Sequence, residues 1–155
     1  MKKILGLVCS LTIISGVCAG VLAYVDSITK EPIKATAEKN REQAKQAVLC
    51  GEGGYTAEGT CKDGYGGDIT LMVGFKKDKK TVISYKVLAA AETPGLGMKL
   101  KTPEFADQFK GKDGHALKVK KDGGEIEAIT SATITSRAVC KAIADAQKKL
   151  VAEAK

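Results

Sequence analysis

Five hydroxyl side chains crowd into the segment AITSATITSRAV, which spans residues 128–139: Thr130, Ser131, Thr133, Thr135 and Ser136. We expect a strand to end at Ile129 and a helix to begin near Ser136, which places these hydroxyls at a strand-to-helix turn. The free N–H groups and the dipole of a helix N-terminus form a site for an anion. Hydroxyls at such a turn suit a phosphate, and Arg137 could add positive charge. The alternative is ordinary capping of the helix by Thr135 or Ser136.

A second segment with the composition of a binding loop is ETPGLG, residues 92–97. Its two glycines and its proline allow the backbone to approach a ligand closely, although any sharp turn has a similar composition. The residue types alone therefore leave the choice open between an anion or cofactor site and a plain turn.

The cysteines indicate a structural role rather than a metal site. Cys50 and Cys61 bracket the glycine-rich segment CGEGGYTAEGTC, which we expect to be a loop. Outside the cytoplasm a disulfide between them is favoured over metal binding, because no histidine or further cysteine pattern accompanies them. Closing a loop of this size is worth about 3 kcal/mol on a chain-entropy estimate. Cys140 falls in an apolar helical pattern and is expected to be buried and free.

The N-terminal segment is long and apolar enough to cross a membrane. Residues 4–25 carry no charge, and at about 1.5 Å per residue they extend roughly 33 Å, against about 30 Å of hydrocarbon in a bilayer. We therefore predict a membrane anchor over residues 1–25, with a cleaved signal peptide as the alternative. Either interpretation places the rest of the chain across the membrane. Lys2 and Lys3 are expected to keep the N-terminus in the cytoplasm.

The net charge of +7 does not indicate a nucleic-acid-binding protein. The lysines are spread along the chain, aromatic residues make up only 5% of it, and no basic cluster alternates with residues that could stack on bases. A solvated basic surface is the simpler interpretation.

Three helices are predicted after the anchor. The segment 29–49 is rich in strong helix formers, with Thr29 at its N-cap, and either extends the membrane helix or packs beneath the domain. A short helix is expected over 102–110, with Pro103 in its first turn. Apolar residues at helical spacing predict a final helix over 136–155.

The strands predict an α+β fold, a small antiparallel sheet packed with helices. Residues 64–90 read as a β-hairpin with the turn KKDKK at 76–80, because apolar residues alternate before this turn and resume after it. Two further short strands are expected over 116–122 and 125–129, around the DGG turn. With the anchor, this divides the chain into three parts, namely residues 1–25 (anchor), 26–49 (membrane-proximal helix) and 50–155 (folded domain).

ETPGLG together with AITSATITSRAV resembles the FMN-binding domain found in the G subunit of the Rnf complex and in the C subunit of the Na⁺-translocating NADH:quinone reductase. The segments GYGGDITLMVGF and EFADQFKGK and the N-terminal anchor fit the same family pattern, in the same order along the chain. The resemblance covers nearly the whole sequence.

The resemblance implies a covalently bound FMN. The family's attachment motif is usually Ser/Thr-Gly-Ala-Thr-x-Ser/Thr-Ser, and this chain reads TSATITS over 130–136, with Ser131 where the glycine usually stands. By this likeness Thr133 is esterified through the FMN phosphate by a separate flavin transferase that uses FAD. The other residues expected around the flavin are Glu92, Thr93, Gly95, Leu96, Gly97, Thr130, Ser131, Ala132 and Thr135.

The resemblance also implies a membrane-anchored electron-transfer subunit of an Rnf-type ferredoxin:NAD⁺ oxidoreductase. Its partners would be the other subunits of that complex, and its FMN domain would lie on the extracytoplasmic side of the cell membrane. The redox alternatives are a stand-alone extracytoplasmic flavoprotein for electron export and the C subunit of the quinone reductase. The non-redox alternative is an anchored binding or scaffold module.

Overall fold

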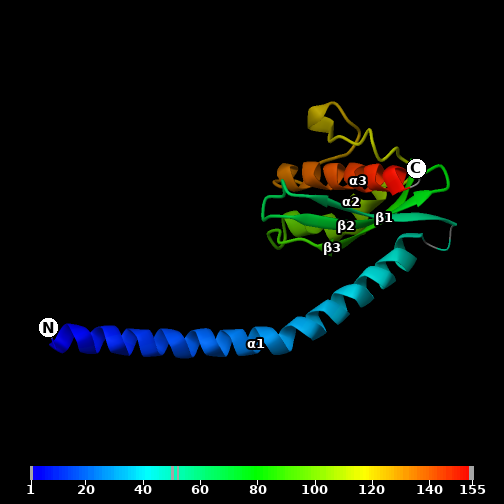
Figure 1. Ribbon diagram of the computed structural model, residues 1–155. Helices are drawn as coiled ribbons and strands as arrows, with labels where there is room; N and C mark the ends of the chain where they lie inside the picture. The colour runs from blue at the N-terminus through cyan, green and yellow to red at the C-terminus, as the bar shows by residue number, and fades with distance from the viewer. Residues whose placement is uncertain (1, 50, 52, 154–155) are drawn as a thin grey trace. The chain divides into compact units, whose positions relative to one another are not determined.

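The computed structural model describes residues 2–49, 51 and 53–153. It contains two compact units, which divide between Lys39 and Asn40, within the predicted membrane-proximal helix. The described residues of the first unit are all helical, and the second unit holds the sheet and the helices packed on it (Figure 1).

The first helix, α1 (Lys2–Leu49), runs through both predicted N-terminal segments without a break. Of the two alternatives for residues 29–49, the structure confirms the one in which this segment extends the N-terminal helix, and only the N-cap expected at Thr29 is wrong. The Thr29 hydroxyl donates to the carbonyl of Val25, one turn earlier in the same helix (2.8 Å). Because residues on both sides of Pro32 favour the helical conformation, Pro32 lies inside the helix rather than at its start.

The apolar part of α1 is a candidate membrane span. Within the described residues, its segment Gly6–Leu49 reaches a mean hydropathy of 2.1 in its most apolar stretch, none of which is buried in the protein. Leu7, Leu11 and Ile14 are each more than 60% exposed. Since large apolar side chains in such number are rarely left in water, the length and composition of this helix suit a lipid environment.

The sheet has three antiparallel strands in the order β1-β2-β3: β1 (Gly54–Cys61), β2 (Ile69–Lys76) and β3 (Val82–Ala89). The predicted hairpin over residues 64–90 is confirmed as β2 paired with β3, and the predicted α+β fold class is confirmed as well. The prediction of a loop between Cys50 and Cys61 is wrong, because residues 54–61 form β1 and pair with β2 along their whole length. Glycine weakens the sequence signal of a strand, so the glycines of this segment hid β1 from the sequence analysis. Glycine is nevertheless required at position 59 of the strand. A Cβ on it would lie 1.9 Å from the carbonyl oxygen of Ala142 on α3.

The central strand is buried on both faces. One face of β2 presents Ile69, Leu71, Val73 and Phe75, all fully buried, to helix α3 (Thr133–Glu153), which covers that side of the sheet (Figure 1). The alternate residue Met72 points to the other face. There it packs with Ala44 and Val48 of the last turns of α1, and these three residues form a second small core.

The segment after β3 is short and irregular, and buried aromatic residues hold it in place. It consists of η1 (Gly97–Lys101), α2 (Pro103–Ala106) and η2 (Asp107–Phe109), so the predicted helix over 102–110 is present but turns into a 3₁₀-helix after one turn. Phe109 packs edge-on against both Tyr85 and Phe105. The Tyr85 hydroxyl donates to the carbonyl of Leu100 (2.6 Å), which ties η1 to β3.

The two short strands predicted over 116–122 and 125–129 are wrong. This segment contains the short 3₁₀-helix η3 (Lys120–Asp122) and a single isolated bridge between Val119 and Ile126. The pair Gly123–Gly124 lets the chain reverse within a few residues. The backbone N–H of Lys120 then donates to the Ile126 carbonyl (2.7 Å). The loop between the two residues is too short for a longer strand pairing.

Helix α3 begins one turn earlier than predicted. The N–H of Ser136 donates to the carbonyl of Ala132 (3.0 Å), so the helical hydrogen bonds start there. The preceding residue, Ser131, has a φ of 61°, in the left-handed region that a side chain disfavours. This conformation explains on physical grounds why a glycine suits this position of the motif.

Ser131→Gly is expected to stabilise the protein. Relief of the left-handed strain is worth about 1–2 kcal/mol, and the greater freedom of glycine in the unfolded chain removes about 0.5–1 kcal/mol of this gain. The net effect is measured as a rise in the thermal unfolding midpoint of the detergent-solubilised chain. Ser131→Ala is the matched control, because it keeps the Cβ and should show no such rise. A lower midpoint for the glycine variant would contradict the account.

Candidate functional site

A pocket of about 490 Å³ lies between the segment that follows β3 and the start of α3. Its lining residues are Tyr65, Glu92, Thr93, Leu96, Gly97, Ser131, Ala132, Thr133, Ile134 and Thr135. The fold therefore brings ETPGLG and the hydroxyl run together in one cavity, whose volume is within the range usual for small-molecule and cofactor sites. Gly95, with a φ of 77° at the loop's turn, and Thr130 are not among the lining residues, and their contact with a flavin stays a prediction.

Glu92 connects three segments that form the pocket. Its side chain is only 6% exposed. One carboxylate oxygen accepts a hydrogen bond from the Thr135 hydroxyl on α3 (2.9 Å), and the other accepts from the backbone N–H of Gly66, beside Tyr65 (3.3 Å). A Cβ at Gly97 would lie 2.5 Å from the carboxylate of Glu92. Glycine at this position therefore lets the loop pass closely over the buried carboxylate.

Neither of the two hydroxyls predicted as N-caps has that role. Thr135 lies inside α3 and uses its hydroxyl to bind Glu92. Ser136 is fully buried, where its hydroxyl accepts from the N–H of Ile129 (2.9 Å) and donates to the carbonyl of Ala132 (2.9 Å). Because the helix starts at Thr133, these two side chains point into the protein. Their hydrogen bonds hold the turn between Ile129 and α3 in place.

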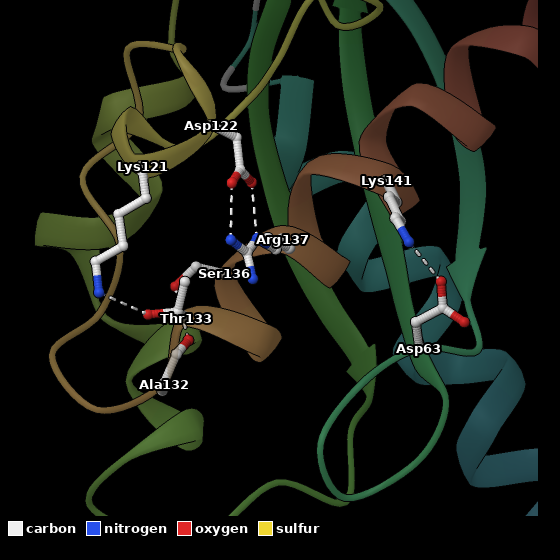
Figure 2. Close-up of polar contacts among 8 residues, drawn as sticks. All are labelled: Asp63, Lys121, Asp122, Ala132, Thr133, Ser136, Arg137 and Lys141. Carbon is white, nitrogen blue, oxygen red and sulfur yellow. Dashed lines mark hydrogen bonds and ion pairs between the residues drawn. The ribbon is translucent and has the colours of Figure 1, made fainter.

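Thr133 is the half-buried hydroxyl of the run that faces the pocket. Its Oγ1 lies 3.4 Å from the ammonium nitrogen of Lys121, which comes from η3 (Figure 2). The N–H groups of the first turn of α3 have no partner within the helix, so they add positive potential at the same place. The arrangement suits a phosphate group bonded to, or resting on, the Thr133 oxygen.

Arg137 does not supply the positive charge expected from the sequence. Its guanidinium instead forms two hydrogen bonds with the Asp122 carboxylate, each of 2.7 Å (Figure 2). These bonds lower the pKa of Asp122 and raise the pKa of Arg137, so the pair stays charged at neutral pH. The cation in contact with the Thr133 hydroxyl is the ammonium group of Lys121, which sequence reasoning missed because this contact depends on the tertiary fold.

Tyr65 is the second site residue that sequence reasoning did not assign. It lies in the glycine-rich loop between β1 and β2, its side chain is 71% exposed, and it lines the same pocket as the 42%-exposed Leu96. An ion pair between Asp63 and Lys141 (2.6 Å) ties this loop to α3 (Figure 2). The sequence signal was an aromatic residue flanked by glycines in the segment GYGG, and such a residue offers a flat apolar surface to a ligand.

Cys61 and Cys140 are not among the residues that line the pocket. Cys140 is buried and free, as predicted, and burial raises the pKa of its thiol to about 12, so it is unreactive at neutral pH. Cys61 is buried at the end of β1 and is free in the structure. Cys50 lies outside the described residues, and the disulfide between Cys50 and Cys61 stays a prediction.

The comparisons with known proteins agree with this geometry. The family model described as "FMN-binding domain" matches residues 64–148, which include every residue that lines the pocket. The G subunit of an ion-translocating oxidoreductase complex from Methanosarcina acetivorans is 30% identical over 173 aligned positions, which cover 92% of each chain.

The G subunit of the proton-translocating ferredoxin:NAD(+) oxidoreductase complex from Clostridium ljungdahlii is 43% identical over 56% of this chain and 48% of its own. The present chain thus aligns with about half the length of that relative. Among solved structures, the C subunit of the Na(+)-translocating NADH-quinone reductase from Parabacteroides distasonis has 26% identity and a TM-score of 0.48, over 62% of this chain and 53% of that one. The family model covers more than half of the sequence, and the archaeal relative aligns along nearly all of it: this protein belongs to the FMN-binding domain family.

Proposed function

We propose that the protein is a membrane-anchored electron-transfer subunit of an Rnf-type ion-translocating oxidoreductase complex, and that it carries FMN covalently on Thr133. The observation that carries the proposal is the pocket in which Thr133, the ETPGLG loop and Tyr65 meet. The relatives named as G subunits of such complexes support membership of the complex, with its other subunits as partners.

The residues around the pocket fit FMN in size and chemistry. Tyr65 and Leu96 present exposed apolar surface, which suits a flat aromatic ring system. Thr133 lies at the N-terminus of α3, and the ammonium group of Lys121 from η3 lies beside its hydroxyl, an arrangement that stabilises a phosphate. When bound, FMN supplies the electron-transfer chemistry, while the protein supplies position and electrostatics. The proposal requires no general acid or base from the chain.

Among the hydroxyls that line the pocket, the hydrogen bonds favour Thr133 as the attachment point. The Thr135 hydroxyl is already bonded to the buried carboxylate of Glu92. Ser131 is exposed, in a strained turn before the helix. Among the described residues, the Thr133 hydroxyl takes part in one side-chain hydrogen bond, an exposed one from the ammonium group of Lys121, so it can react without the loss of a buried hydrogen bond.

The attachment reaction balances as a phosphoryl transfer without any oxidant. The Thr133 oxygen forms a bond to the phosphorus of the FMN half of FAD, the pyrophosphate P–O bond breaks, and AMP leaves. The hydroxyl proton passes to a base of the flavin transferase. The product is a phosphodiester with one negative charge at the helix N-terminus, which the dipole and the free N–H groups stabilise.

The proposed topology is a single pass by α1, with the N-terminus in the cytoplasm and the FMN domain outside it. Lys2 and Lys3 precede the apolar segment and favour a cytoplasmic N-terminus. Covalent attachment suits this location, because a flavin that dissociated outside the cytoplasm would be lost to the surroundings.

Thr133→Ala is expected to abolish covalent loading. The full chain, co-expressed with a flavin transferase, should gain the mass of one FMN residue and show flavin fluorescence in a denaturing gel. The alanine variant should lose both signals completely, because it lacks the oxygen that bonds to phosphorus.

Thr130→Ala is the matched control for this experiment. It removes a hydroxyl from the same turn, but Thr130 is exposed and does not line the pocket. This variant should keep its covalent mass increase. A wild-type chain without added mass, or an alanine variant at Thr133 that still gains it, would contradict covalent attachment at this residue.

The topology is measured with reporter fusions at the C-terminus of the full chain. Alkaline phosphatase folds only outside the cytoplasm and should be active, whereas green fluorescent protein exported in an unfolded state should stay dark. The reverse pair of results would show that the FMN domain faces the cytoplasm and would overturn the proposed orientation.

A further inference from the structure

Three consecutive charged residues form the short 3₁₀-helix η3, and two of them have partners of opposite charge. The ammonium group of Lys120 lies 3.2 Å from the Glu127 carboxylate. Asp122 is paired with Arg137 through two hydrogen bonds. Lys121, between them, has no carboxylate within ion-pair distance among the residues that the structure describes. Its ammonium group lies 3.4 Å from the neutral hydroxyl of Thr133 instead.

The neighbouring ion pair holds η3 beside the start of α3. Arg137 follows Thr133 by four residues, so the two side chains lie on the same face of the helix. Asp122 follows Lys121 directly in η3. Figure 2 shows that Asp122 extends toward Arg137 and that Lys121 extends toward Thr133. A bidentate contact between a guanidinium and a carboxylate fixes orientation as well as distance. The Asp122–Arg137 pair thereby determines where the Lys121 backbone lies relative to Thr133.

We propose that Lys121 is a phosphate ligand of the attachment site and that the Asp122–Arg137 pair is its positioning device. The inference rests on the proposed function, since it requires a phosphate on Thr133. Attachment converts the neutral hydroxyl into a phosphodiester with one negative charge. Lys121 then gains an anionic partner, so Coulomb attraction adds to a hydrogen bond in which only the lysine was charged before.

Arg137 is unsuited to this role because Asp122 already occupies its guanidinium. Removing Arg137 from Asp122 to bind the phosphate would leave a carboxylate beside the new anion. In the structure, the negative charge of Asp122 stays paired with Arg137. The ammonium group of Lys121, which has three rotatable donors, remains available for the phosphate.

Lys121→Gln and Lys120→Gln form a matched pair for the test. Each removes one positive charge from the same turn of η3, but only Lys121 contacts Thr133. The full-length chain is purified in detergent with and without FMN loading, and two quantities are measured. These are the ³¹P chemical shift of the phosphodiester and the change in thermal unfolding midpoint on loading.

The Lys120→Gln protein is expected to match the wild type in both quantities. The Lys121→Gln protein should show a shifted ³¹P resonance and a smaller loading-dependent rise in the midpoint, with an unchanged midpoint before loading. Loss of loading in Lys121→Gln alone, with normal folding, also supports the inference, because it places Lys121 at the reacting hydroxyl. Arg137→Gln should move the resonance in the same direction as Lys121→Gln, because the lysine loses its fixed position.

The two possible failures give different results. If the wild type carries no phosphodiester on Thr133, the proposed function fails. If the wild type is loaded and Lys121→Gln matches Lys120→Gln in both the ³¹P shift and the midpoint, the function stands and Lys121 is not a phosphate ligand.

Discussion

The carboxylate of Glu92 is buried, and both of its oxygens accept hydrogen bonds from segments that lie far from it in the sequence. One bond comes from Thr135 on α3 and the other from the N–H of Gly66 in the loop between β1 and β2. A buried carboxylate without such partners would be strongly destabilising. The same two bonds that make its burial possible bring together the three walls of the pocket. The pocket therefore forms where the buried carboxylate finds its hydrogen-bond donors. Glycine is required at position 97 because a side chain there would collide with the Glu92 carboxylate.

The pocket combines two kinds of chemistry. The exposed side chains of Tyr65 and Leu96 come from loops. The start of α3 provides the Thr133 hydroxyl and a helix dipole, and η3 brings the ammonium group of Lys121 beside that hydroxyl. FMN has the same division between an aromatic ring system and a phosphate. In the proposed function, attachment through Thr133 would place the phosphate at the start of α3 and the ring against the loops that carry Tyr65 and Leu96.

The sequence predicted the elements whose patterns are local. The β2–β3 hairpin follows from alternating apolar residues, and most of α3 follows from helical spacing. Strand β1 was missed because Gly54 and Gly59 weaken its strand signal, although Gly59 is required for the close packing of α3. The early start of α3 was missed because the hydroxyls of Thr135 and Ser136 looked like caps, while their actual partners are Glu92, Ile129 and Ala132.

The residues of the candidate site also fall into those that a local sequence pattern identifies and those that depend on the tertiary fold. ETPGLG and the hydroxyl run could be identified from sequence, and the structure places most of their predicted site residues in one pocket. Lys121 could not be identified, because nothing in its neighbourhood distinguishes it from Lys120. The distinction comes from the tertiary fold, which places Lys121 beside Thr133 and Lys120 beside Glu127.

The decisive measurement is a structure of the full-length protein after loading with FMN. Covalent attachment at Thr133 predicts flavin density in the pocket between Tyr65, Leu96 and the start of α3, continuous through a phosphate with the Thr133 side-chain oxygen. Flavin density on another face of the domain, or joined to a different residue, would contradict it.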